Sequence, residues 1–515
     1  MSRTNKFLGG IGFGYASQVI TTLIGFWLTP FLLRHIGQHN YGLWLVGTQL
    51  MFYLALLDVG IVALLPRETA FATGRARTID EATELPLIFG HTVRIVLWQM
   101  PLVVLGALIA WFMMPADWEG LRNPIGLVLL AFVITFPLRI FRAVLQGLQD
   151  LAYLGRTGII CYLIGTGTTV ALVLAGWGLY ALAIGWTVQQ SAAAITGWYR
   201  LRVRFPTVLP KSLPAMPWSA ARTRLTQGGW VSLSQVSQVL LNGTDILIVG
   251  KLFGPAAVVP FVITSKLINV LSNQPQMLMA SAGPALSQLR MAESKQRLSG
   301  VCVALSQAML MVSGLVVCVV LAINQGFVGR WVGTGQFGGS WLTALILLSM
   351  LLRHWNLTIA TALLFFGRER RLCMTSVLDG FVSVGAIFLF VREFGLIGAP
   401  LGAIAGVCFI SLPANLWALS HEGNLSVGRL IEPLLPWFFR FAFLAVCIAM
   451  VARIWIPNTF LMIGLTAAVT AIIYTALMFP LALRAPLGDY VRPRLFPISA
   501  RVFRVLRLGK AAEQS

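Results

Sequence analysis

Two basic residues lie deep inside long apolar stretches of the sequence. Lys266 lies in the stretch 257–281, about 14 Å from its start if the stretch is a helix that rises about 1.5 Å per residue. Arg353, followed by His354, lies at a similar depth in the stretch 341–366. Lysine binds phosphate as a point charge, and arginine binds it through two parallel hydrogen bonds. This pattern predicts a water-filled cavity with a cationic wall, to which Lys266, Arg353 and His354 contribute as binding residues.

Two acidic residues, Asp58 and Asp379, lie in apolar stretches of their own. At the centre of a bilayer a charge costs roughly 2.5–3.5 kcal/mol, so it needs either a partner or a water-filled cavity. An ion pair between one of these carboxylates and Lys266 or Arg353 would remove that cost within the protein itself. A structural ion pair is therefore the alternative to substrate binding.

A row of polar residues follows one face of a third apolar stretch. Gln235, Gln238, Asn242 and Asp245 are separated by three, four and three positions, which places them on the same side of a helix. They could form the hydrophilic wall of a central cavity that binds substrate. They could equally form hydrogen bonds that hold neighbouring helices together. The sequence leaves both interpretations open.

Motifs for covalent chemistry are missing from the sequence. It contains no phosphate-binding Walker loop, no nucleophile elbow and no HExxH zinc motif. Its six cysteines fall inside apolar stretches without the spacing of a metal site or a disulfide framework. We therefore expect no enzyme activity, no cofactor and no metal site.

The elements that position these residues are apolar helices. The chain is 57% hydrophobic and only 11% charged, and its mean hydropathy is +0.82. A helix needs about 20 mostly apolar residues to cross a bilayer, and only helices satisfy the backbone hydrogen bonds of such stretches in lipid. The sequence predicts an all-α polytopic membrane protein with about fourteen spans, at 7–33, 41–65, 88–114, 124–147, 153–176, 179–200, 226–250, 257–281, 300–323, 341–366, 372–391, 395–419, 434–456 and 459–483.

The basic residues predict the orientation of these spans. Most of the 38 Lys and Arg residues fall on the side that holds both chain ends and every second loop, and basic residues stay on the cytoplasmic side. We expect a bacterial cytoplasmic (inner) membrane protein with both termini in the cytoplasm. The net charge of +21 then indicates contact with anionic membrane lipids rather than nucleic acid. Arg501, Arg504 and Arg507 would lie on the membrane surface as one face of an amphipathic helix.

A repeat divides the chain. Gly37 and Gly178 recur as Gly254 and Gly395 at one constant offset, as do several residues around them. Two parallel repeats with a binding site between them are a common transporter plan. The predicted domains are two pseudosymmetric six-helix bundles (1–200 and 226–420), the proline-rich basic linker 201–225, two extra helices (434–483) and a basic cytoplasmic tail (484–515).

The N-terminal part of the chain carries a family resemblance. The first span ends in Arg34-His35-Ile36-Gly37, the second begins with Tyr41-Gly42-Leu43-Trp44, and Leu57-Asp58-Val59-Gly60-Ile61 follows. This resembles the polysaccharide-biosynthesis or oligosaccharide flippases of the multidrug/oligosaccharidyl-lipid/polysaccharide (MOP) exporter superfamily. The resemblance implies two bundles that open alternately inward and outward. It also implies a polyprenyl-diphosphate-linked oligosaccharide as substrate, flipped from the cytoplasmic to the periplasmic leaflet.

Three residues are candidates for gating or conformational change: Arg34, Asp58 and Asp379. Of these, Arg34 and Asp58 belong to the resembling motif. We expect Asp58 to pair with Arg67, Arg139 or Arg142 and to hold one state of the transport cycle. The alternative is a helix-end carboxylate without a role in transport.

Two other functions compete with this one. An ion-coupled multidrug extruder of the same superfamily would favour an acidic cavity, whereas the predicted cavity is cationic. A membrane polysaccharide polymerase or glycosyltransferase would need a long outer loop, and the predicted outer loops are short. Besides its lipid-linked substrate, the expected partners are the polysaccharide polymerase and the export machinery.

Overall fold

The computed structural model describes residues 3–75, 81–292, 295–424 and 426–492, with the side chains of 3–15, 277–292, 295–299 and 365 outside that description. The predicted amphipathic face of Arg501, Arg504 and Arg507 therefore lies outside the described residues. Within these ranges all regular elements are helices and none is a strand. The chain divides into two compact units, which separate between Val259 and Pro260.

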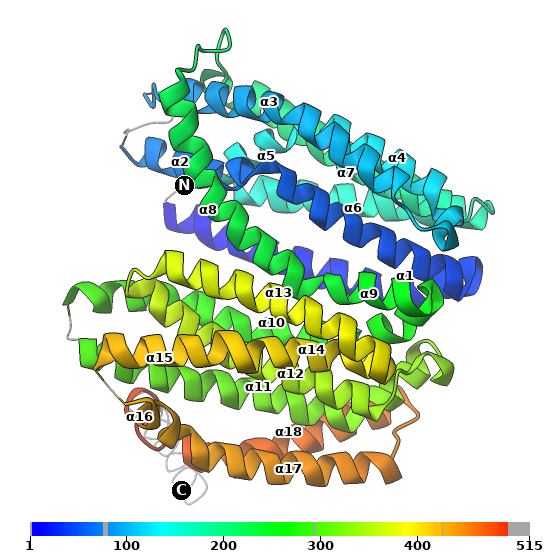
Figure 1. The fold of residues 1–515 in the computed structure, drawn as a ribbon, viewed down its shortest axis with the longest axis vertical. Coiled ribbons are helices and arrows are strands. Elements are labelled where there is room, and N and C mark those ends of the chain that lie inside the picture. Colours follow the sequence, from blue (N-terminus) through cyan, green and yellow to red (C-terminus); the bar gives the residue numbers. More distant parts are fainter. Residues whose placement is uncertain (1–2, 76–80, 293–294, 425, 493–515) are drawn as a thin grey trace, which may run out of the picture. The chain divides into compact units, whose positions relative to one another are not determined.

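The first unit consists of helices α1 to α9, and its long members lie side by side (Figure 1). They are α1 (Arg3–Ala55), α2 (Ile61–Arg75), α3 (Leu85–Phe112), α4 (Glu119–Thr135), α5 (Arg139–Gly147), α6 (Leu151–Leu174), α7 (Leu179–Arg204), α8 (Trp218–Asn242) and α9 (Thr244–Phe253), with short turns η1 (Leu56–Asp58), η2 (Ala116–Trp118) and η3 (Pro206–Val208).

The second unit contains most of α10 and all later helices. They are α10 (Pro255–Ala292), α11 (Lys295–Trp331), α12 (Ser340–Phe365), α13 (Glu369–Phe394), α14 (Gly398–Gly406), α15 (Leu412–Gly423), α16 (Val427–Ile431), α17 (Leu435–Ile454) and α18 (Phe460–Ala482), with short turns η4 (Thr334–Gln336), η5 (Gly395–Ile397) and η7 (Glu432–Leu434) and the π-helical segment η6 (Val407–Ser411).

The helices confirm the predicted class of all-α polytopic membrane protein. Of the described segments, 10 are long and apolar enough to cross a membrane, or up to 11 with the bent pair α8 and α9. Two of these segments, Ala16–Asp58 and Glu369–Gly423, each cover two predicted spans. Dividing these two segments and counting the bent pair brings the described spans close to the about fourteen predicted. Helix α7 coincides with the predicted span 179–200 but is less apolar than the others.

Glycines of the sequence repeat share their backbone conformations. Gly37 (φ 80°, ψ 163°) and Gly254 (φ 82°, ψ 163°) both break a helix path in a region that only glycine enters readily. Gly178 (φ 52°, ψ −128°) and Gly395 (φ 68°, ψ −145°) form the second matched pair. The repeat therefore extends to local structure. The compact units nevertheless separate after the predicted linker 201–225, so that α8 and α9 pack within the first unit.

Three predicted continuous spans are wrong in detail, because each contains a break. The span 41–65 is interrupted at Leu56–Gly60, where Val59 is left-handed and Gly60 has φ 68°. The span 124–147 is interrupted before Arg139, next to Pro137, which lacks an N–H to continue the helix. The span 226–250 bends by 43° between α8 and α9. The first two breaks shape the site described below.

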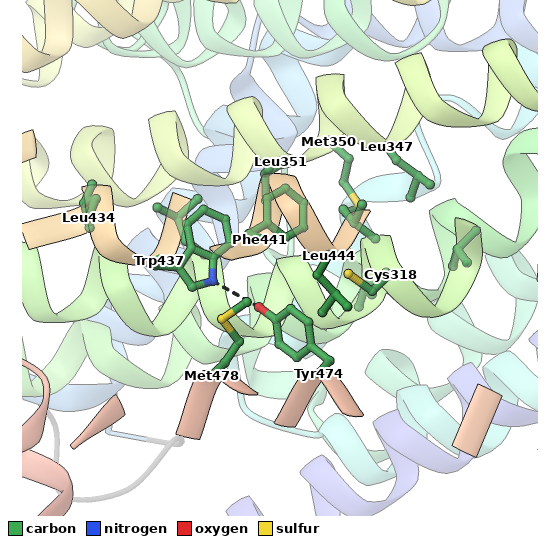
Figure 2. Packing of buried hydrophobic residues seen from close by; sticks show 14 of the residues in the cluster. Cys318, Leu347, Met350, Leu351, Leu434, Trp437, Phe441, Leu444, Tyr474 and Met478 are labelled. Carbon is green, nitrogen blue, oxygen red and sulfur yellow. Dashed lines mark hydrogen bonds between the residues drawn. The ribbon is translucent and has the colours of Figure 1, made fainter. Parts of the chain in front are cut away.

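The last two helices belong to the core of the second unit. Trp437 and Phe441 of α17 stack with ring centroids 4.8 Å apart, and Trp437 Nε1 donates a hydrogen bond to the Tyr474 hydroxyl of α18 at 3.1 Å (Figure 2). That hydroxyl donates in turn to the Met311 carbonyl of α11 at 2.8 Å. A Cβ on Gly314 would approach the same hydroxyl within 2.5 Å. The two helices thus pack tightly on α11.

Candidate functional site

A cavity of about 910 Å³ lies inside the first unit. Its volume is at the upper end of the range of about 300–1,000 Å³ found for small-molecule sites. Helices α1, α2 and α4 to α8 and the turn η1 all contribute lining residues. Four of its lining residues have charged side chains: Asp58, Arg67, Arg139 and Arg142. With three guanidinium groups and one carboxylate, the cavity has a net positive charge.

The break after α1 fixes the carboxylate. Asp58 is only 2% exposed, and its Oδ1 accepts a hydrogen bond from the Gly60 backbone N–H at 2.8 Å. The Asp58 carbonyl accepts another from Gln99 Nε2 of α3 at 3.0 Å. A Cβ on Gly60 would approach the carbonyl oxygen of Gly228 of α8 within 2.4 Å, so α8 packs directly on this turn. The Asp58 side chain is thereby held at the wall of the cavity.

The break before α5 positions the arginines. Arg139, Arg142 and Gln146 follow at spacings of three and four, which places them on one face of α5, and all line the cavity. Arg139 Nη2 lies 3.9 Å from Asp58 Oδ2. The Nη1 atoms of Arg139 and Arg142 are buried without a hydrogen-bond partner among the described residues. Unpaired buried donors are rare, and here they are available to an anion.

The predicted polar face of α8 is only partly in this cavity. Gln235 lines it, and the Gln235 Oε1 atom is buried without a partner in the described part of the chain. Gln238 and Asn242 are exposed and do not line the cavity. They are joined to each other instead, since Asn242 Nδ2 donates to Gln238 Oε1 at 3.1 Å. Helical spacing correctly identified a shared face, but it could not identify which part of that face borders a cavity.

Arg353 lies in a polar network of the second unit. Its Nη1 lies 3.5 Å from Asp379 Oδ2, and its Nη2 donates to the Ala403 carbonyl at 3.1 Å. Ser383 Oγ donates to Asp379 Oδ1 at 3.0 Å, and Asp379 is 1% exposed. Arg353 therefore has the structural ion pair that was the alternative to substrate binding.

The other two predicted binding residues of the second unit differ in their surroundings. His354 is 3% exposed, its Nδ1 is 2.8 Å from Ser313 Oγ and its Nε2 is 3.4 Å from Gln276 Nε2. Lys266 is half-buried on α10, and it forms no ion pair or hydrogen bond with another residue in the described ranges. The gating candidate Arg34 is exposed, three residues before the break at Gly37.

In the sequence, Arg139 and Arg142 fall within the predicted span 124–147 and Arg67 follows the second span, and all three were expected as partners of Asp58 but not as binding residues. The sequence did contain a pattern that predicts a shared helix face for Arg139 and Arg142. Pro137 ends one helix, and the spacing of Arg139, Arg142 and Gln146 then gives the next helix a polar face. Pairing of Asp58 with Arg139 agrees with one of the three partners considered for it.

Comparison with known proteins identifies the fold and the family. Residues 33–335 match the family model "Polysaccharide biosynthesis protein", and no curated protein sequence matches the chain. The lipid II flippase MurJ in an inward-closed conformation is similar over 93% of this chain and 100% of its own, with 11% identity and a TM-score of 0.65. An inward-facing multidrug resistance MATE transporter of the MOP superfamily is similar over 78% of this chain and 94% of its own, with 16% identity and a TM-score of 0.59.

A third similar structure is a MOP superfamily transporter from Pyrococcus furiosus whose binding pocket has reverse polarity. It covers 80% of this chain and 95% of its own at 16% identity, with a TM-score of 0.51. At these identities the likeness concerns the fold alone, whereas the family model covers more than half of the chain. The chain is a multi-pass membrane protein that belongs to the polysaccharide biosynthesis protein family and has the fold of MOP superfamily transporters.

Proposed function

We propose that this protein moves a polyprenyl-diphosphate-linked oligosaccharide from the cytoplasmic to the periplasmic leaflet of a bacterial inner membrane, by alternating access, for surface polysaccharide biosynthesis. The observation that carries the proposal is the cationic cavity of the first unit. Family membership supports the substrate class. The alternation itself would need the two units to move, and Asp58 and Arg139 are proposed to hold one of the states.

The charge of the cavity suits such a substrate. A diphosphate presents only acceptors and negative charge, and a guanidinium presents only donors and positive charge. Arg139 and Arg142 each have a buried nitrogen without a partner among the described residues. A diphosphate that entered the cavity would satisfy both, and it would compete with Asp58 for Arg139, which lies 3.9 Å from that carboxylate.

This proposal moves the main phosphate contact from the second unit to the first. Lys266 stays a proposed substrate-binding residue of the second unit, because it has no partner within the described ranges. Arg353, His354 and Asp379 are proposed to stabilise the fold, because their polar atoms already contact one another or nearby groups. Arg34 remains a proposed gating residue beside the break at Gly37.

The runner-up function, extrusion of cationic drugs, fits the cavity poorly. A cation would meet three arginines and one carboxylate, and like charges in a site of low dielectric constant repel strongly.

The proposal is tested by deleting the gene and analysing the lipids of the deletion strain. We expect polyprenyl-diphosphate-linked oligosaccharide to accumulate on the cytoplasmic side and surface polysaccharide to be lost, with both effects reversed by the wild-type gene. Purified protein in vesicles should then make the same glycolipid accessible on the opposite leaflet. Normal polysaccharide export in the deletion strain, or vesicles that move cationic dyes but no glycolipid, would contradict the proposal.

A further inference from the structure

The cavity of the first unit has a charged end and a neutral end. All four charged lining residues lie on η1, α2 and α5. The walls that α1, α4, α6, α7 and α8 contribute are uncharged, and the polar groups on α7 and α8 are the amides Gln190 and Gln235 and the indole of Trp186. The two kinds of wall would recognise different parts of one ligand.

Helix geometry gives the separation along α7. Gly197 packs against Arg142, whose Cγ would lie 3.0 Å from a Cβ at that glycine, so this level of α7 is beside the charged end. Gln190 lies about 10 Å and Trp186 about 16 Å earlier along the helix, at about 1.5 Å per residue. Between them and Gly197, Ala193 and Ala194 line the cavity with small side chains. Gln190 and Trp186 therefore lie about two and three helical turns along α7 from the point where α5 packs on it.

Helix α8 gives the same order. Gly228 packs against the Val59 carbonyl, with 2.5 Å between that oxygen and a Cβ on the glycine, directly beside Asp58. The same turn also contacts α8 at Ser232, whose backbone N would lie 2.9 Å from a Cβ on Gly60, and Gln235 follows about 4.5 Å further along α8. Gln235 therefore lies about one helical turn from the Asp58 turn, so the amide wall is next to the charged residues.

The neutral end suits sugar chemistry. A pyranose presents hydroxyl groups that both donate and accept hydrogen bonds, and a glutamine amide also does both, whereas a guanidinium only donates. The Gln235 Oε1 atom is a buried acceptor without a partner among the described residues. An indole ring offers a large apolar surface with one donor at its edge, on which the C–H face of a pyranose can lie.

We infer that Trp186, Gln190 and Gln235 form a saccharide subsite that binds the sugars next to the diphosphate. The inference rests on the proposed function and makes it more specific: the arginines bind the carrier's diphosphate, and the α7–α8 wall selects carriers that bear sugar. A carrier without sugar binds only to the charged end. Discrimination between loaded and empty carrier is then a property of these three side chains.

The test compares two ligands on the purified full-length protein. One is the lipid-linked oligosaccharide isolated from a strain that lacks the transporter, and the other is the same polyprenyl diphosphate without sugar. The measured quantity is the ratio of their Kd values, determined on one preparation of each variant, so that a loss of folded protein affects both ligands equally. Gln190→Leu, Gln235→Leu and Trp186→Leu are the test variants.

The chain supplies matched controls. Gln189 neighbours Gln190 but packs against Gly165 and does not line the cavity, and Gln238 lies on the same helix as Gln235 but outside the cavity. We expect each test variant to reduce the preference for the loaded carrier by roughly three- to tenfold, with binding of the empty carrier unchanged. For the glutamines this is the effect of losing one neutral hydrogen bond, and for Trp186 it is the loss of the ring surface under the sugar. Gln189→Leu and Gln238→Leu should keep the wild-type ratio.

The possible outcomes distinguish a failure of the saccharide subsite from a failure of the proposed transport function. If the wild-type protein binds both carriers equally, or if test and control variants give the same ratio, the saccharide subsite is wrong while diphosphate recognition stands. If the wild-type protein binds neither carrier, the proposed function fails first. A reduced ratio confined to the lining variants supports the subsite.

Discussion

Each unit contains an arginine close to a buried aspartate, and the two pairs differ in a way that separates binding from folding. In the second unit, Arg353 lies 3.5 Å from Asp379 and also donates to the Ala403 carbonyl, while Ser383 holds the carboxylate. In the first unit, Arg139 lies 3.9 Å from Asp58, and its Nη1 atom is buried without a partner in the described residues. The first pair borders the cavity of about 910 Å³.

The difference shows that depth in an apolar helix does not identify a binding residue. A charge within a membrane protein needs compensation, and either a structural partner or a ligand can provide it. The number of donors left unsatisfied is more informative than depth. By that criterion we propose that the first unit binds the anion and that the second unit's arginine stabilises the fold. The following variants test this contrast.

The largest effect is expected for the double variant Arg139→Gln, Arg142→Gln. It removes two of the three cavity guanidinium groups and leaves Asp58 as an uncompensated negative charge. Each lost charge-assisted hydrogen bond is worth about 1.5–3 kcal/mol, so transport of the glycolipid in vesicles should fall by roughly a hundredfold or more. Because the buried Asp58 then lacks its cation, the free energy of unfolding should also decrease, so transport is measured per folded molecule. Full transport by the double variant would remove the cavity from the mechanism.

Arg353→Met should instead damage stability. It leaves the buried Asp379 without its cation, and breaking a buried pair typically costs about 3–5 kcal/mol; the 23% exposure of the Arg353 side chain moves the expectation towards the lower value. Thermal unfolding of the purified protein would measure the loss. Adding Asp379→Leu should restore much of the stability, and transport per folded molecule should stay normal in the double variant. Transport that stays lost at restored stability would make Arg353 a binding residue after all.

Asp58→Asn should have a smaller and opposite effect on binding. The change removes the carboxylate that competes with the ligand for Arg139 but keeps an oxygen that can accept from the Gly60 N–H. We expect polyprenyl diphosphate to bind a few-fold more tightly and transport to slow, because the state held by the ion pair is lost. Equilibrium binding and the rate of flipping measure the two effects separately. An unchanged rate would exclude a role for Asp58 in the transport cycle.

The smallest effect is expected for Tyr474→Phe in the second unit. The variant loses the hydrogen bond from Trp437 and the one to the Met311 carbonyl while keeping the packing of the ring. Each such bond contributes about 1 kcal/mol, so the unfolding temperature should decrease modestly and transport should not change. A selective loss of transport would show that α17 and α18 take part in the cycle.

Sequence patterns predicted most of the fold and less of the site. Apolar length predicted the spans, and the repeated glycines predicted matching breaks at Gly37 and Gly254. The site depended on two further breaks, at Leu56–Gly60 and next to Pro137. Hydropathy does not report such breaks, because a broken span and a continuous one have the same composition. As a result Arg139 and Arg142 fell inside one continuous predicted span and were considered only as partners of Asp58, although their spacing fits one face of a separate helix.

The sequence also could not predict which polar side chains border a cavity and which form ion pairs. Gln235, Gln238 and Asn242 share a helix face, yet only Gln235 borders the cavity, because the packing of α8 against other helices decides where that face is open. Likewise, the sequence allowed two interpretations of Arg353: binding of a ligand, or an ion pair with Asp379. The choice depends on the approach of α13 to α12, which a single sequence does not specify.

The central claim is that an anionic substrate binds to the arginines of the first unit. The most direct test is the Kd of polyprenyl diphosphate for the purified full-length protein, its Arg142→Gln variant and the control Arg122→Gln. Arg122 is exposed, lies over the Trp111 ring and does not line the cavity. We predict that Arg142→Gln weakens binding by roughly ten- to a hundredfold while Arg122→Gln has no effect. Equal binding by all three proteins would contradict the account.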